Sequence, residues 1–197
     1  MALNTEKSSL ESLELLEPGK YFVERRQQTT RVPSDRRQHS QSGVASSDRI
    51  AAMLENVQMF KDLEWAQIKA LSEYMQIYRA PPKAVLFREG DQGDFMCVLL
   101  EGKLDVHKED NQHVDKTVTT ILPGRSLGEM TIVDGEPRSA TAVAVVTSVL
   151  AVLTQENFMQ IMRDKPALSA KLLFKIAQLI SQRLRLTSGI LVDYLES

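Results

Sequence analysis

Cysteine is nearly absent from this sequence, with Cys97 the only one among 197 residues. A single thiol has no partner within its own chain, so no internal disulfide framework holds the fold together. Cys97 lies in the apolar run "FMCVLL". In such a run a free thiol usually behaves as a small buried hydrophobe. A chain of this length buries enough apolar surface to fold without covalent links.

A strong excess of either charge sign is also missing, as are long hydrophobic runs. Lys and Arg number 24 against 26 Asp and Glu. This balance argues against a nucleic-acid binder unless a local basic patch exists. No apolar segment reaches the length of a membrane span, and acids alternate with the leucines of the first 20 residues, unlike a signal peptide. We therefore expect no membrane span and a cytoplasmic location.

The first quarter of the chain has few large apolar residues. Residues 20–47 are rich in Arg, Gln, Ser and Thr, a composition that cannot bury a core. The sequence predicts a disordered N-terminal extension over 1–47 and a single folded domain over 48–197. The helical spacing that starts at Ser47 marks this boundary.

The folded part is predicted to change from helix to strand and back. Apolar residues at helical spacing predict two helices between Ser47 and Tyr78, the second ended by "APP". Short apolar runs follow from Ala84 to Leu153, and six of the nine glycines lie between 90 and 135. This pattern is typical of a β-roll. Thr154 then caps a helix, and a long helix follows Pro166. The predicted class is α+β, a β-roll (double-stranded β-helix or jelly roll) with N-terminal helices and a long C-terminal helix.

The long C-terminal helix carries more apolar surface than one face needs. Its apolar residues fall in two stripes at near-heptad spacing. The first stripe is Leu173, Ile176, Ile180, Leu184, Thr187, Leu191 and Tyr194, and the second is Leu172, Leu179, Leu186 and Ile190. Two stripes predict two covered surfaces, which favours a homodimer through this helix. The alternative is that both stripes pack within one monomer.

The stretch "SLGEMTIVDGEPRSATAV", residues 126–143, places Glu129 directly after a glycine and its only base, Arg138, nine residues later. "GEM" is typical of the first turn of a short helix, whose free N–H groups attract an anion. Gly128 would allow close approach of the backbone. Arg138 offers a planar fork of donors for two phosphate oxygens, with Ser139 and Ala140 adding small donors. Glu129 would accept from a hydroxyl beside that phosphate, such as the ribose 2′-OH of a 3′,5′-cyclic nucleotide.

With these residues in view, the sequence resembles the cyclic nucleotide-binding domain family, which includes the catabolite activator protein and the regulatory subunits of cyclic-AMP-dependent protein kinase. The resemblance runs from about Phe60 to Leu186. It is carried by "REGDQGDFMCVLLEGKLDV" (88–106), "LPGRSLGEMTIVDGEPRSATAVA" (122–144) and the closing helices.

The resemblance implies roles for individual residues. Gly128 and Glu129 match the ribose-binding pair of the family, and Arg138, Ser139 and Ala140 match its phosphate-binding residues. Met130 and Thr131, the next two residues of the site, stand where the family more often has Leu and Ala or Ser.

The closing helix has its own counterpart in the family. "RLRLTS" resembles the base-contacting segment of catabolite-activator-type proteins, which makes Thr187 and Ser188 candidates for contacting the base. The alternative is that a helical hydroxyl bonds its own backbone carbonyl. No helix-turn-helix follows the long helix in the printed sequence, so we expect no direct DNA binding.

The sequence thus predicts a non-enzymatic sensor in which cyclic AMP, or alternatively cyclic GMP, moves the C-terminal helix and thereby acts on an effector protein. The runner-up is a structural or protein-interaction module that keeps the fold without binding nucleotide. A metal or haem sensor has little support, because Cys97, His107 and His113 form no recognisable ligand cluster. An enzyme has less, since no nucleophile and base, P-loop or carboxylate pair is present in a catalytic context.

Overall fold

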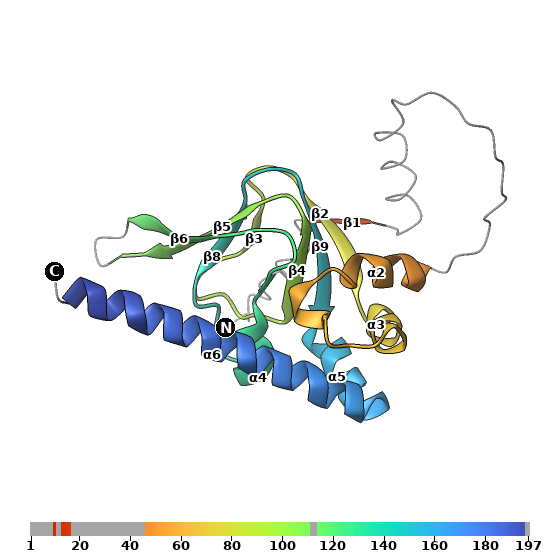
Figure 1. Cartoon of the computed structure of the whole chain (residues 1–197). Coiled ribbons are helices and arrows are strands. Elements are labelled where there is room, and N and C mark those ends of the chain that lie inside the picture. The colour runs from red at the N-terminus through yellow and green to blue at the C-terminus, as the bar shows by residue number, and fades with distance from the viewer. Residues whose placement is uncertain (1–9, 11–12, 17–45, 111–113, 196–197) are drawn as a thin grey trace, which may run out of the picture.

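The computed structural model describes residues 10, 13–16, 46–110 and 114–195, without the side chains of residues 46 and 190–195. Helices flank two antiparallel sheets (Figure 1). The first sheet has the order β1-β2-β9-β4-β7 and the second β3-β8-β5-β6. The strands are β1 (Glu14–Leu16), β2 (Gln76–Ala80), β3 (Val85–Phe87), β4 (Phe95–Glu101), β5 (Leu104–Glu109), β6 (Asp115–Ile121), β7 (Ser126–Leu127), β8 (Thr141–Ala144) and β9 (Ser148–Thr154).

The helices come before, within and after the strands. Two short segments, α2 (Ser46–Leu54) and α3 (Trp65–Ser72), precede β2 and are separated by the 3₁₀ turn η2 (Gln58–Phe60). The six-residue α4 (Glu129–Asp134) interrupts the roll after β7. The chain continues after β9 into α5 (Gln155–Asp164) and α6 (Pro166–Leu195), and Thr154 caps α5 by accepting from the Asn157 N–H. The predicted α+β roll with a long C-terminal helix is confirmed.

Strand β4 separates two apolar cores, which explains its unbroken apolar run. Met96 and Val98 face a core shared with the helices. Phe95, Cys97 and Leu99 face a core enclosed by the two sheets. Alternate residues of a strand point to opposite faces, so a strand buried on both faces needs no polar residue. Burial raises the pKa of the Cys97 thiol to about 12, consistent with its predicted role as a buried hydrophobe.

The structure corrects one predicted helix. The apolar pattern predicted helix as far as Tyr78, but α3 ends at Ser72 and Gln76–Ala80 form strand β2. Strand β2 pairs with β9 along its whole length, with Ile77 opposite Ala151. Three residues of β2 are buried, so tertiary pairing decided the conformation where local spacing fitted a helix.

A second correction concerns residues 13–16, which lie within the predicted disordered extension. Residues 14–16 form β1, antiparallel to β2, with Leu16 opposite Ile77. Leu13 and Leu16 are 7% and 5% exposed. These two leucines give the segment an apolar anchor, and the polar composition of the residues after it does not predict that anchor. The rest of the extension up to residue 45 lies outside the described residues.

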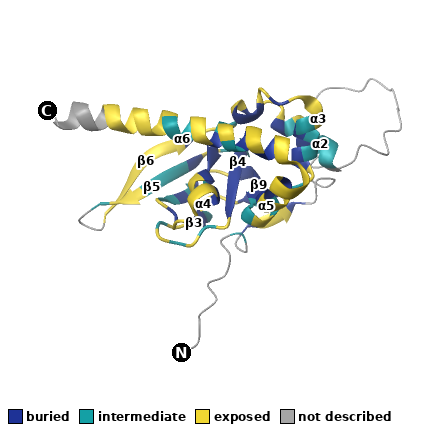
Figure 2. Cartoon of the chain, turned by 90° about the horizontal axis from the view of Figure 1, so that it is seen from below, coloured by how far each residue is buried: buried dark blue, intermediate teal, exposed yellow. Residues whose placement is uncertain are grey.

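The first half of helix α6 packs on the domain, and its second half extends away from it (Figure 2). In its first half, Leu168, Leu172 and Ile176 are buried in the helix-facing core. In its second half, Leu184 and Leu186 are 66% and 70% exposed. The monomer therefore does not cover these two members of the predicted stripes. The side chains of Ile190, Leu191 and Tyr194 lie outside the described residues.

Candidate functional site

The site is built around Gly128, which joins β7 to α4. Gly128 has φ of 77° and serves as the N-cap of α4. A Cβ at this position would lie 2.4 Å from Nη1 of Arg138 and 3.0 Å from the Phe95 carbonyl oxygen. Only glycine combines this backbone conformation with so close an approach. The predicted glycine and the predicted arginine are therefore in direct contact.

Arg138 is interior, with 3% of its surface exposed. Its Nη2 donates to the Phe95 carbonyl at 2.7 Å and its Nη1 to the Gly128 carbonyl at 3.2 Å. Its Nε has no hydrogen-bond partner in the described part of the chain. Burial lowers the pKa of Arg138 because the cation loses hydration. The guanidinium is thus a buried cation held by backbone carbonyls, with donor capacity left over.

Two aromatic rings hold this guanidinium in place. Its Cζ lies 4.2 Å from the centroid of the Phe87 ring and 4.5 Å from that of Phe95. The two rings meet edge to face, with centroids 6.1 Å apart, so they form a corner around the cation and not a sandwich. Such contacts stabilise a desolvated guanidinium. The motif alone gave no sign of these rings, because they come from β3 and β4.

Glu129 is the second buried charge, with no exposed surface. Its Oε1 forms an ion pair with Nη1 of Arg183 in α6. Nη2 of Arg183 donates to the Ser126 carbonyl at 2.6 Å. Oε2 of Glu129 has no partner among the described residues. The described contacts therefore join Glu129 to the closing helix and not to Arg138.

Arg183 is the residue that the sequence reasoning missed, although it opens the quoted segment "RLRLTS". It follows Ile176 by seven residues and Ile180 by three, which places it on the face of α6 that packs on the domain. A charged residue on an inward face signals a buried partner. That signal was available from the sequence.

The remaining predicted residues occupy different environments. Thr131 is 3% exposed and lies close to Arg138 beside Gly93, whereas Met130 is 43% exposed and faces away from the core. Ser139 is exposed and Ala140 half-buried, both directly after Arg138.

Thr187 and Ser188 are exposed on α6. Their hydroxyls donate to the carbonyls of Arg183 and Leu184 at 2.9 and 2.8 Å. This is the bonding pattern that the sequence left open as the alternative to a base contact. The structure brings Gly128, Glu129, Thr131 and Arg138 together and leaves Thr187 and Ser188 bonded within their own helix.

The described residues also bear on metal sites and membrane spans. None of their groups of His, Cys, Asp and Glu has three members placed to hold a metal ion. Within the same residues, no helix combines the length and apolar character that crossing a membrane requires.

Comparisons with known proteins concern the family of the chain. The family profile described as "Cyclic nucleotide-binding domain" matches residues 78–165. The chain is 34% identical over 116 residues to a cAMP-dependent protein kinase regulatory subunit of Blastocladiella emersonii, covering 59% of this chain and 29% of that protein. It is 28% identical over 142 residues to a CRP-like cAMP-activated global transcriptional regulator of Mycobacterium tuberculosis, covering 72% of this chain and 61% of that one. The chain thus spans less than two thirds of either relative.

A solved structure gives fuller coverage. The crystal structure of a cyclic nucleotide-binding domain from Methylobacillus flagellatus superimposes with a TM-score of 0.67 and 30% identity, covering 75% of this chain and 83% of that one. The chain belongs to the cyclic nucleotide-binding domain family.

Proposed function

We propose that this protein is a non-enzymatic sensor that binds a cyclic nucleotide, cyclic AMP in the first place and cyclic GMP as the alternative, between Arg138 and Glu129. One observation carries the proposal. Arg138 and Glu129 carry opposite charges and are both buried, and among the described residues Nε of Arg138 and Oε2 of Glu129 have no hydrogen-bond partner. Buried polar groups are normally satisfied, so an unfilled pair of this kind suits a ligand.

The chemistry of the two groups matches the two halves of such a ligand. A guanidinium pairs with phosphate oxygens, and a carboxylate accepts from ribose hydroxyls. The proposed ligand contacts are those predicted from the sequence: Gly128, Glu129, Met130, Thr131, Arg138, Ser139, Ala140, Thr187 and Ser188. To contact the base, Thr187 and Ser188 would have to break the hydrogen bonds that their hydroxyls donate to carbonyls of their own helix. Relatives whose names mention cyclic AMP support this nucleotide, and relatives whose names mention cyclic GMP support the alternative.

The coupling to the closing helix is proposed to run through Arg183. A ribose that engages Glu129 alters the environment of the carboxylate that α6 holds. By linkage, any displacement of α6 then changes nucleotide affinity by the same factor as nucleotide changes the helix equilibrium. Coupling of this kind is typically about 1–3 kcal/mol. The readout is proposed to be an effector protein in the cytoplasm, reached by a homodimer through α6 and without direct contact to DNA.

Isothermal titration of the purified chain with cyclic AMP, cyclic GMP and cyclic di-GMP tests the proposal, with 5′-AMP as the control for cyclisation. Saturable binding of cyclic AMP or cyclic GMP at a stoichiometry of about one per chain, with weaker binding of 5′-AMP, is the expected result. Absence of binding by every cyclic nucleotide at millimolar concentration would overturn the proposal in favour of an interaction module without a nucleotide.

A further inference from the structure

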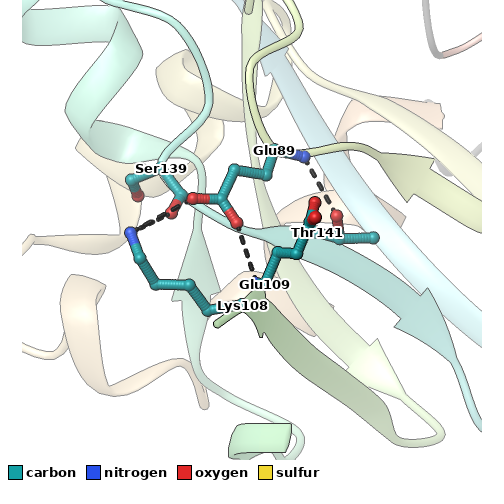
Figure 3. Close-up of polar contacts among 5 residues, drawn as sticks. All are labelled: Glu89, Lys108, Glu109, Ser139 and Thr141. Atoms are coloured by element: carbon teal, nitrogen blue, oxygen red, sulfur yellow. Dashed lines mark hydrogen bonds and ion pairs between the residues drawn. The ribbon is translucent and has the colours of Figure 1, made fainter. Parts of the chain in front are cut away.

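Three segments that are distant in the sequence meet at Glu89, in the turn between β3 and β4 (Figure 3). Its Oε1 lies 3.2 Å from Nζ of Lys108 in β5. Its Oε2 accepts from the Glu109 N–H at 3.2 Å. Its own N–H donates to Oγ1 of Thr141, at the start of β8, at 3.0 Å. Glu89 therefore connects its turn to the end of β5 and to β8, the strand that follows the proposed phosphate-binding residues 138–140.

Lys108 also contacts the proposed phosphate-binding residues 138–140. Its Nζ donates to the Ser139 carbonyl at 3.1 Å. None of the described peptide bonds is cis. In a planar trans peptide the carbonyl and the following N–H point in opposite directions. By holding the Ser139 carbonyl, Lys108 therefore fixes the direction of the Ala140 N–H, one of the donors proposed for the phosphate.

The same turn brackets the backbone of Arg138. The Arg138 N–H donates to the Asp91 carbonyl at 2.8 Å, and the Arg138 carbonyl accepts from the Gly90 N–H at 2.8 Å. These bonds hold the residue before Ser139. The Lys108 contact holds the carbonyl of Ser139, the next residue. Hydrogen bonds therefore fix consecutive peptide groups on both sides of Arg138 and after Ser139.

We propose that Lys108 and Glu89 are positioning residues for the cyclic phosphate, acting through the Ser139–Ala140 peptide and not by contact with the ligand. The inference rests on the proposed function and names residues outside the predicted motif. Glu89 holds the ammonium of Lys108, and Lys108 holds the carbonyl. The Glu109 N–H and Lys108 lower the pKa of Glu89, so its carboxylate is ionised at neutral pH.

Lys108→Met tests the first step, with Lys116→Met as the matched control. Lys116 lies opposite Lys108 in the β5–β6 register and pairs with Asp110 at 2.8 Å. Both substitutions remove one positive charge from the same hairpin. Lys108→Met is expected to weaken cyclic AMP binding about three- to tenfold, the usual range for one lost hydrogen bond, while Lys116→Met stays within about twofold.

Glu89→Gln separates positioning from simple electrostatics by the sign of its effect. Removal of a negative charge near an anionic ligand would strengthen binding if long-range attraction were the only role. Loss of the ion pair that holds Lys108 weakens binding instead, and weaker binding is expected. Tighter binding by Glu89→Gln would overturn the inference.

The Ala140 amide gives a readout that does not depend on affinity. In ¹H–¹⁵N spectra of the nucleotide-bound protein, the Ala140 cross-peak is expected to move in Lys108→Met and to stay in place in Lys116→Met. A parent that binds cyclic AMP while both lysine variants bind alike, with an unmoved Ala140 cross-peak, would overturn this inference alone. A parent that binds no cyclic nucleotide would overturn the proposed function and this inference with it.

Discussion

Arg183 of helix α6 forms an ion pair with the fully buried carboxylate of Glu129, although 54 residues separate the two in the sequence. The arginine remains 43% exposed at its side chain. It therefore connects the interior of the site to a helix that extends away from the domain (Figures 1 and 2). We predict that a change at Glu129 and a change in α6 are linked through Arg183.

Arg183→Ala is expected to lower the free energy of unfolding by about 1–3 kcal/mol, because it leaves a buried carboxylate without its partner. It should also speed amide exchange in residues 184–195, which lose their anchor to the domain. Denaturant unfolding and hydrogen exchange measure the two effects. Arg185→Ala is the control, since Arg185 is exposed and contacts Ser181 within its own helix. Equal behaviour of the two variants would show that the ion pair does not hold α6.

Arg138→Ala is expected to reduce nucleotide affinity by about 2–4 kcal/mol through loss of a charge-assisted contact. Arg138 is interior and bonds two backbone carbonyls. Its removal should therefore also lower stability, by about 1–3 kcal/mol. Calorimetric titration and thermal unfolding of the same samples separate the effects. Parent-like affinity in a folded Arg138→Ala would refute the phosphate assignment.

The motif, the roll and the long helix could be predicted from the sequence because each depends on local spacing. The glycine before Glu129 and the arginine nine residues later are near neighbours in the chain. The corner formed by Phe87 and Phe95 could not be predicted, since it depends on how β3 and β4 meet in space. Strand β2 was mistaken for helix for the same reason, because its conformation is decided by pairing with β9. Residues 13–16 were overlooked because the composition of the whole extension hides two buried leucines.

Gly93→Ala tests whether the space around Arg138 is required. An added Cβ would lie 2.6 Å from Nε of Arg138 and 2.6 Å from Cγ2 of Thr131. The φ of Gly93 lies outside the left-handed region, so the backbone accepts alanine and only the contact changes. Overpacking of this kind costs about 1–3 kcal/mol, and we expect about tenfold weaker cyclic AMP binding.

Gly135→Ala is the control for this substitution. Its Cβ would meet nothing within 4 Å, while its φ of 71° strains the backbone. It should cost about 1 kcal/mol of stability and leave affinity unchanged. Affinity in Gly93→Ala that equals that of Gly135→Ala would show that the position of Arg138 tolerates displacement.

Removal of residues 1–16 is expected to lower stability by about 1–3 kcal/mol relative to removal of residues 1–9 alone. The longer deletion exposes the edge of β2 and removes the buried Leu13 and Leu16. In the intact chain, the conformational entropy lost when β1 becomes ordered offsets part of the stabilisation that these leucines provide. Leu13 packs in the same core as Phe87 and Phe95, so nucleotide affinity should fall as well. Thermal unfolding and titration of both truncated chains check this. Identical melting temperatures of the two truncated chains would mean that β1 does not stabilise the domain.

The last prediction concerns the exposed leucines of α6. Leu184 and Leu186 are 66% and 70% exposed in the monomer, which leaves them available to a second copy. Leu184→Glu places a charge in this stripe and should give a folded monomer, because the half of α6 before Ile180 supplies the buried contacts. Leu15→Glu is the control, since Leu15 is 55% exposed on β1 in the opposite part of the domain (Figure 1).

Sedimentation of the parent and the two variants, each with and without cyclic AMP, provides the measurement. Since Leu184 follows Arg183 directly, nucleotide binding at Glu129 should change self-association of the parent, and by linkage dimerisation should change affinity by the same factor. The control should follow the parent. If the parent stays monomeric at tens of micromolar with and without the ligand, α6 does not form a homodimer.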